Sequence, residues 1–307
     1  MKTSPLAHTY SIAARDPETG CFGVAVQSHW FSVGSVVAWV EAGVGAVATQ
    51  ATVEVSYGPL GLDRLRAGQP AAQALAELTA ADPEKELRQV AMVDAHGRVA
   101  AVTGARCIAE AGHITGEGFS VQANMMLNAS VWPAMAEAYR SARGSFAERL
   151  VTTLEAAQVA GGDIRGKQSA CVKIAAAQPT RQPWNGLLVD LRVEDHPEPL
   201  QEIRRLVKIQ RAYQDMNHGD EELGKGNIEK ALEFYRNAAS IAPEISEIPF
   251  WHAVTLLDVG RVEEALAILA PIFKAEPNWA LLLERLPAAG LLHASPEAMA
   301  RAQALSC

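Results

Sequence analysis

The sequence has few cysteines, and their spacing excludes the sites that cysteines usually build. Only four of its 307 residues are cysteine, at positions 21, 107, 171 and 307, and no two of them form a Cys-x-x-Cys pair. Neither a zinc site nor a dithiol redox motif is therefore indicated. We expect reduced thiols in a cytoplasmic protein, with Cys107 and Cys171 in the core of apolar strands.

Long apolar runs and an excess of positive charge are also absent. No stretch approaches the roughly 18–20 apolar residues that cross a bilayer, and residues 1–8 lack the apolar run of a secretory signal. The 35 acidic residues outnumber the 27 basic ones, which gives a net charge of −8. This balance argues against a general nucleic-acid binder, so we expect neither membrane nor nucleic acid as a partner.

The sequence contains no motif for a nucleotide, a metal or another cofactor. It has no Walker loop, no Gly-x-Gly-x-x-Gly fingerprint, no His-Glu-x-x-His and no Gly-x-Ser-x-Gly elbow. The eight histidines are scattered without the spacing of metal ligands. We therefore expect neither a metal nor a cofactor.

Enough apolar sequence is present for two folded domains. Hydrophobic residues make up 49% of the chain, and 307 residues exceed the usual size of one core. Up to about residue 195, short β-like runs mix with Ala-rich helical segments, and the sequence beyond is almost wholly helical. Pro197 and Pro199 punctuate the junction. We predict one domain over residues 1–195 and a second over 196–307.

The expected elements of the first domain come in blocks. The sequence predicts strands at 10–15, 21–28, 35–41 and 44–50, helices at 61–67 and 71–81, strands at 89–93, 98–103 and 118–124, helices at 131–141 and 145–160, and strands at 169–176 and 186–193. Segregated blocks favour an α+β fold, with two sheets face to face and helices outside, over alternating βαβ units.

The second domain contains an internal repeat. Residues 226–232 (GNIEKAL) align with residues 260–266 (GRVEEAL), Pro243 with Pro277 and Leu223 with Leu257, always at an offset of 34 residues. This period, with Gly between helices and Ala where they cross, is typical of tetratricopeptide repeats. The alternative is an ordinary helical bundle with a chance repeat.

Several segments between residues 8 and 178 carry a resemblance to a known family. They are HTYSIAARD at 8–16, GVAVQS at 23–28, AGVGAVATQA at 42–51, YGPLGL at 57–62, RQV at 88–90, VAAVTG at 99–104 and GGDIRGKQSA at 161–170. In this order they resemble the uncharacterised family DUF1028, which is assigned to the N-terminal-nucleophile (Ntn) hydrolase superfamily. The resemblance implies a four-layer αββα sandwich and, from the superfamily, amide hydrolysis as the reaction class. Related chains with helical tails have been labelled peptidoglycan-binding.

The resemblance implies that Thr9 is the nucleophile, because it opens the first strand as the family's N-terminal Thr does. In this chemistry the hydroxyl attacks an amide carbonyl, and the residue's own α-amine, with a pKa of ~7.7–8.0, is the general base. This sequence departs from the pattern because eight residues precede Thr9. While they remain attached the Thr9 nitrogen is an amide, so activity requires cleavage between His8 and Thr9. A Thr that only starts a strand is the alternative.

Polar residues at two strand ends are further candidates. Ser28 and His29 follow the second strand, near where superfamily members place an assisting group. We expect Ser28 to contact substrate and His29 to orient it or tune the amine, and a solvent-facing loop histidine is the alternative. Asn124 ends a strand, with Gln122 on the same face. It is a candidate donor to an oxyanion. The alternative is that its side chain only satisfies hydrogen-bonding groups at the end of the strand.

Four more residues are candidates for substrate binding. Asp163 and Arg165 lie in a Gly-flanked loop that allows close backbone approach. Either Arg165 recognises a carboxylate, or the pair braces the sheet edge. Glu54 and Tyr57, near the first helix, are expected to line the same cleft.

Two functions remain open from the sequence. One is a cytoplasmic, metal-free amide hydrolase that acts on a small amide or peptide-like substrate through Thr9. The other is a catalytically silent scaffold whose helical tail binds a peptide, a protein or a cell-wall fragment in a concave groove. Two repeats are few for stability, so we expect the tail to pack on the sandwich or to dimerise. The sequence is compatible with a homo-oligomer and does not set the number of subunits.

Overall fold

The computed structural model describes residues 6–306, which form two compact units. Contacts divide the chain between Val207 and Lys208, within helix α5 (Pro199–Gly224). The first unit combines antiparallel sheets with helices, and the second is helical. A mixed α/β region followed by a helical region is thereby confirmed. A boundary for independent folding after residue 195 stays a prediction.

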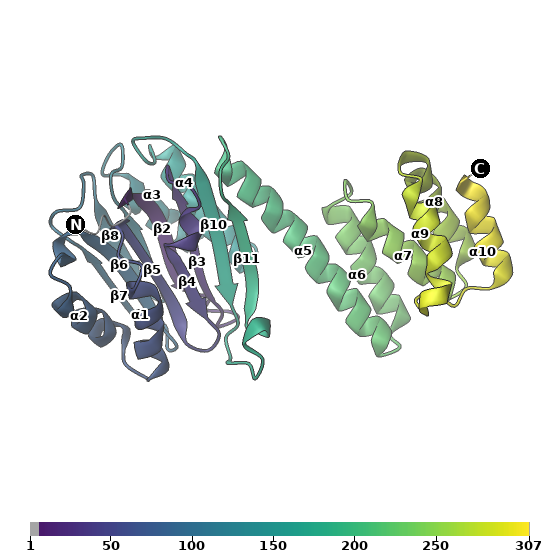
Figure 1. Cartoon of the computed structure of the whole chain (residues 1–307), viewed down its shortest axis with the longest axis horizontal. Coiled ribbons are helices and arrows are strands. Elements are labelled where there is room, and N and C mark those ends of the chain that lie inside the picture. The colour runs from purple at the N-terminus through teal and green to yellow at the C-terminus, as the bar shows by residue number, and fades with distance from the viewer. Residues whose placement is uncertain (1–5, 307) are drawn as a thin grey trace. The chain divides into compact units, whose positions relative to one another are not determined.

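Two antiparallel sheets form the first unit (Figure 1). In the described chain, the first sheet has five strands and the second has six. The first sheet runs in the order β1 (Leu6–Ala7), β5 (Gly45–Thr52), β6 (Arg88–Asp94) and β7 (Val99–Thr103), with β4 (Ala38–Glu41) also paired to β5. The second runs in the order β11 (Leu187–Val193), β10 (Ser169–Ala175), β3 (Phe22–Ser28), β2 (Thr9–Arg15), β9 (Phe119–Ala123) and β8 (Gly112–Gly116).

The central strand β2 is buried on both faces, which explains its nearly continuous apolar sequence. Tyr10 and Ile12 pack into the cluster beneath the helices of the second sheet. Ala13, on the opposite face, belongs to the apolar cluster between the sheets. Ser11 shares that inner face and is one of the polar residues there.

Helices cover each sheet. Helices α1 (Tyr57–Arg66) and α2 (Ala71–Ala81) pack apolar side chains, including Leu62 and Leu75, on Val90 and Met92 of the first sheet. Helices α3 (Val131–Ser141) and α4 (Phe146–Val159) cover the second sheet through residues such as Leu150. Ser145 begins α4 with a capping box, which satisfies two amide groups at its start.

The helical unit repeats a helix pair. Its further helices are α6 (Ile228–Ile241), α7 (Glu247–Asp258), α8 (Val262–Ala275), α9 (Asn278–Arg285) and α10 (Pro296–Gln303). Helices α6 and α8 start 34 residues apart, two residues after Gly226 and Gly260, which have φ of 80° and 78°. The aligned Ala231 and Ala265 are both fully buried. The predicted repeat therefore folds as two equivalent helical segments.

Short 3-10 turns complete the chain, at Val33–Ser35, Lys85–Leu87, Pro183–Asn185, Pro287–Ala289 and Ala304–Ser306. One expectation needs correction: Cys107 lies in a bend outside the strands and is only half-buried. Cys171 is fully buried in β10, as expected. Burial raises the pKa of the Cys107 thiol to about 11 and that of Cys171 to about 12.

Candidate functional site

Thr9 lies where the chain crosses from the first sheet to the second. Ala7 ends β1, which pairs with β5, and Thr9 begins β2, which pairs with β3 and β9. His8 is the single residue between the two strands. Thr9 is fully buried, and its hydroxyl donates a 2.7 Å hydrogen bond to the carbonyl oxygen of Ala7. The hydroxyl of the nucleophile predicted from the sequence is therefore buried and hydrogen-bonded to the backbone two residues before it.

The carbonyl oxygen of His8, immediately before Thr9, accepts two hydrogen bonds from side chains. The Ser28 hydroxyl donates one of 2.6 Å, and a guanidinium nitrogen of Arg165 donates one of 2.7 Å. Ser28 is also the register partner of Thr9 across β2 and β3. Two donors that converge on one carbonyl oxygen, one of them charged, are the elements of an oxyanion hole.

Asp163 holds Arg165 in this position. Its two carboxylate oxygens accept hydrogen bonds of 3.0 and 2.7 Å from the Arg165 guanidinium, and its side chain is 0% exposed. The backbone N–H groups of Arg165 and His29 also donate to this carboxylate, at 2.9 and 3.3 Å. A fully buried carboxylate with this many donors is both paired and hydrogen-bonded, which offsets its desolvation.

Asn124 contacts both residues of the His8–Thr9 peptide. Its side-chain oxygen lies 2.7 Å from His8 Nδ1, and its backbone N–H donates 3.1 Å to the carbonyl oxygen of Thr9. The Asn124 amide nitrogen donates 2.8 Å to Gln89, so the network assigns the proton of the imidazole to Nδ1. Burial lowers the pKa of His8, which favours the neutral form of the ring. Its Nε2 is buried without a partner among the described residues.

A polar network that the sequence reading missed joins the sheets beside this site. Ser11 donates 2.6 Å to Gln50, and Gln50 donates 2.7 Å to Gln89 and 3.2 Å to the Thr9 carbonyl oxygen. Gln122 donates 2.6 Å to Ser11. All four of these side chains are fully buried. The signal in the sequence is a serine or glutamine within each of four strands that are otherwise largely buried and apolar in their middle.

His29 lies beside the Asp163 loop but exposes its ring. Its backbone N–H binds Asp163, and its Nδ1 lies 3.3 Å from the carbonyl oxygen of Lys167. The structure thus brings Thr9, Ser28, Asn124, Asp163 and Arg165 together around His8. The catalytic role expected for His29 stays a prediction.

Glu54 and Tyr57 line a different pocket. Its volume is about 270 Å³, its wall also includes Leu60, Leu78 and Asp82, and Thr9 is not among its lining residues. The Tyr57 hydroxyl donates 3.1 Å to Asp82, and burial together with that carboxylate raises the tyrosine's pKa above its usual value. Substrate binding by Glu54 and Tyr57 stays a prediction.

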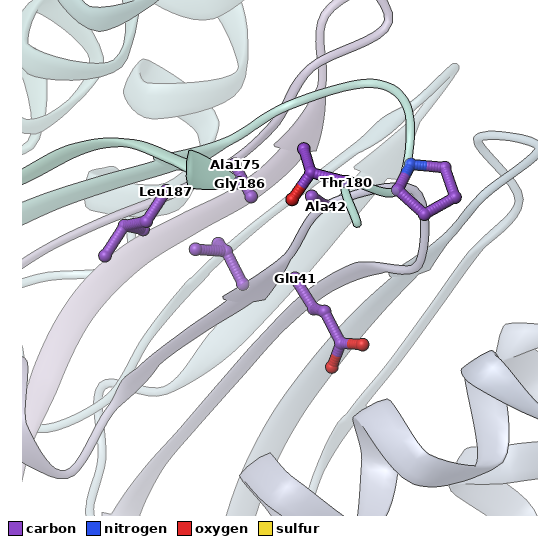
Figure 2. Close-up of a pocket in the computed structure, with 8 residues that line it drawn as sticks. Glu41, Ala42, Ala175, Thr180, Gly186 and Leu187 are labelled. Carbon is purple, nitrogen blue, oxygen red and sulfur yellow. The ribbon is translucent and has the colours of Figure 1, made fainter. Parts of the chain in front are cut away.

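Another pocket has a volume of about 340 Å³ and is shown in close-up in Figure 2. Glu41, Ala175 and Thr180 are in its wall. Ala175 pairs with Phe22, whereas Ser169, at the other end of β10, pairs with Ser28 beside Thr9. This pocket is thus separated from the polar site by the length of β10.

Residues 6–306 contain neither a cluster of metal ligands nor a membrane-spanning helix. No three His, Cys, Asp or Glu side chains in this range are placed to hold a metal ion. Within the same range, none of the helices combines the length and apolar composition needed to cross a membrane.

Comparison with known proteins places the first part of the chain in a family. A family model described as "Family of unknown function (DUF1028)" matches residues 9–203, and so begins at Thr9. The chain belongs to this family. The crystal structure of protein SPO2555 from Silicibacter pomeroyi, also a DUF1028 protein, is similar, with 32% identity and a TM-score of 0.59 over 66% of this chain and 88% of that one. A tetratricopeptide repeat model matches residues 222–286 behind the DUF1028 region. No curated protein matches the sequence.

Proposed function

We propose that the DUF1028 unit is an amide hydrolase of the Ntn type and that the uncut chain is its inactive precursor. The observation that carries this proposal is the carbonyl before Thr9, which is held by Ser28 and Arg165. Two sheets, with α1 and α2 outside one and α3 and α4 outside the other, fit the four-layer αββα sandwich of that class. The match that begins at Thr9 also supports it.

The chemistry would begin once the His8–Thr9 bond is cleaved. The freed α-amine, with a pKa of ~7.7–8.0, accepts the proton of the Thr9 hydroxyl as its oxygen attacks the substrate carbonyl. Ser28 and Arg165 donate to the oxyanion, in the place where they now hold the His8 oxygen. The substrate C–N bond breaks, and the leaving amine takes the proton from the Thr9 ammonium. Water then hydrolyses the Thr9 ester, which releases the acid and restores the hydroxyl.

The uncut chain cannot run this reaction. Its Thr9 nitrogen is a peptide amide without basicity, and its hydroxyl is buried and bonded to Ala7. Removal of residues 1–8 takes away both the amide and that acceptor. Processing is therefore the step that activates the site.

A direct test compares three proteins by intact mass and by hydrolysis of a panel of peptide anilides. These are the full-length chain, a chain that starts at Thr9 after removal of an initiator Met, and the same short chain with Thr9→Ala. Of these three, the unsubstituted short chain alone is expected to release aniline. A fourth protein, the short chain with Thr9→Ser, should retain activity because serine keeps the hydroxyl. Hydrolysis by a preparation whose mass shows residues 1–8 intact would exclude Thr9 as an N-terminal nucleophile.

For the helical unit we propose binding of a protein or peptide. A pocket of about 340 Å³ lies within this unit, lined by aromatic and apolar side chains that include Tyr235, Trp251 and Leu291. Leu291 is 59% exposed, so it is available to a partner. In a peptide-display selection with the full chain, Leu291→Glu should abolish enrichment. The matched change Leu281→Glu, at an exposed leucine outside the pocket lining, should not.

A further inference from the structure

The two residues of β1 occupy an edge of β5 that has no other partner among the described strands at that point. Leu6 pairs with Thr52 and Ala7 with Ala51. Since β6 follows the opposite edge of β5, β1 and β4 share this edge. The β4 pairing reaches only Ala48. If residues 1–8 leave, the backbone groups of Ala51 and Thr52 are left as an open slot beside Thr9.

An open strand edge of this kind binds extended peptides. A peptide that adds as a strand gains backbone hydrogen bonds, and alternate side chains enter pockets that set specificity. The slot lies one residue from the proposed nucleophile, on its acyl side, because β1 is followed by His8 and then Thr9. A substrate peptide bound in this slot as a strand would therefore end at the carbonyl group that Thr9 attacks.

The surroundings of Ala7 and His8 define which side chains a bound peptide can have at these two positions. Ala7 is fully buried in the apolar cluster between the sheets, where Val26 and Val53 also lie. A larger side chain would have to displace this cluster. His8 is only 1% exposed, and its Nδ1 pairs with Asn124. This environment favours a neutral ring that can donate one hydrogen bond.

We infer that residues 6–8 occupy the binding site for the acyl side of the substrate, and that the substrate is a peptide cleaved after an Ala-His-like pair. The inference rests on the proposed hydrolase function. The peptide adds to β5 as a short antiparallel strand, with a small side chain where Ala7 lies and a hydrogen-bonding neutral ring where His8 lies. The carbonyl oxygen of the last residue of this peptide accepts the two hydrogen bonds that Ser28 and Arg165 now donate to His8.

The test uses the chain that starts at Thr9 and three acetylated tripeptide acids as probes. Acetyl-Leu-Ala-His represents residues 6–8, acetyl-Leu-Phe-His enlarges the residue at the Ala7 position, and acetyl-Leu-Ala-Phe removes the ring nitrogens. By calorimetry, the first is expected to bind about tenfold more tightly than either of the others, which corresponds to one lost hydrogen bond or one steric conflict. Asn124→Ala should remove the preference for His over Phe and leave the preference for Ala. Equal binding of the three peptides overturns the inference.

Hydrolysis is measured separately with the aminomethylcoumarin amides of the same peptides. If the three peptides bind with the expected order of affinities but no coumarin is released, the peptide-binding site is supported and the hydrolase function is rejected. Release of coumarin without preference for Ala-His would retain the hydrolase and reject the site.

A second measurement applies if the short chain does not fold. Acetyl-Leu-Ala-His added during refolding should then restore the native circular dichroism spectrum, because it refills the slot left by residues 6–8. Acetyl-Leu-Phe-His should not do so. Failure of acetyl-Leu-Ala-His to restore the fold, or equal rescue by both peptides, counts against the inference.

Discussion

The Ser28 hydroxyl lies 2.6 Å from the carbonyl oxygen of His8 and donates a hydrogen bond to it. Ser28 sits opposite Thr9 in the β2–β3 pairing, so the donor and the proposed nucleophile belong to adjacent strands and are fixed by their register. Arg165 supplies a second, charged donor from a loop outside those strands. The sheet therefore positions one donor rigidly, and the Asp163 carboxylate positions the other.

Replacement of Ser28 by Ala is expected to lower kcat about 10²–10³-fold in the chain that starts at Thr9, with little change in KM. The reason is that a preorganised donor to an oxyanion contributes mainly in the transition state. The rates would be measured with acetyl-Leu-Ala-His aminomethylcoumarin amide. Ser35→Ala is the matched control, because Ser35 is exposed and its hydroxyl donates to the nearby Ser32 carbonyl oxygen. An equal fall in both variants would contradict a catalytic role for Ser28.

Helices with clear sequence boundaries could be predicted. Helices α2 and α3 have the expected bounds, 71–81 and 131–141. Pro70 before the first and Asp82-Pro83 after it mark its ends. Helix α1 begins at Tyr57 rather than 61, because Pro59 is accommodated in its first turn.

Strands held only by tertiary pairing could not be predicted. The two-residue β1 and the strand β8 (Gly112–Gly116) were absent from the sequence reading. Strand β8 has glycine at both ends and little apolar alternation, and its pairing with β9 is what keeps it extended. The pairing of β1 depends in the same way on β5, far along the chain.

The candidate site was predictable in its parts but not in its arrangement. The family resemblance implies Thr9, and residue type with position at a strand end or in a loop indicates Asn124 and Arg165. The network of Gln50 and Gln89 is not predictable, because neither strand alone indicates which residue of the other lies opposite. Only the register that pairs these two glutamines brings their amides together. Likewise no local pattern distinguishes the Thr9 site from the separate pocket that Glu54 and Tyr57 line.

Replacement of Asp163 by Asn is expected to lower the free energy of unfolding by about 2–3 kcal/mol. The change removes the charge that pairs with Arg165 while both groups stay largely out of water. Urea unfolding followed by fluorescence would measure it. Asp190→Asn serves as the control, because its ion pair with Arg192 is 25% and 38% exposed and should contribute less than about 1 kcal/mol. Similar losses in the two variants would argue against a special role for Asp163.

Ala51, which pairs with Ala7, has a φ of 74°, in the left-handed region that favours glycine. Ala51→Gly relieves this strain but loses a buried methyl group, so we expect nearly unchanged stability. Ala48→Gly, at a fully buried position in the same strand, has no such strain to relieve. The second variant should therefore be about 1 kcal/mol less stable than the first. Thermal unfolding of the two full-length variants measures the difference, and the reverse order would contradict the assigned strain.

His252 is expected to make the helical unit lose stability in mild acid. It is 6% exposed, and burial, followed by the charges of Arg236 and Arg261, lowers its pKa to about 4. Above pH 6.5 the imidazole is neutral in both folded and unfolded chains, so its full contribution is present. Between pH 6.5 and about 4 the unfolded chain binds a proton that the folded chain does not, and stability falls as the pH falls.

Comparison of the full-length protein with His252→Leu isolates this effect. The free energy of unfolding of the unsubstituted chain should fall by about 1–2 kcal/mol more than that of the variant between pH 6.5 and pH 5. Far-ultraviolet circular dichroism in urea, at several pH values, gives both quantities. His218→Leu, at an exposed position in α5, is the control for the loss of a histidine as such. Parallel pH profiles for the unsubstituted chain and His252→Leu would mean that His252 is protonated as easily in the folded chain as in the unfolded one.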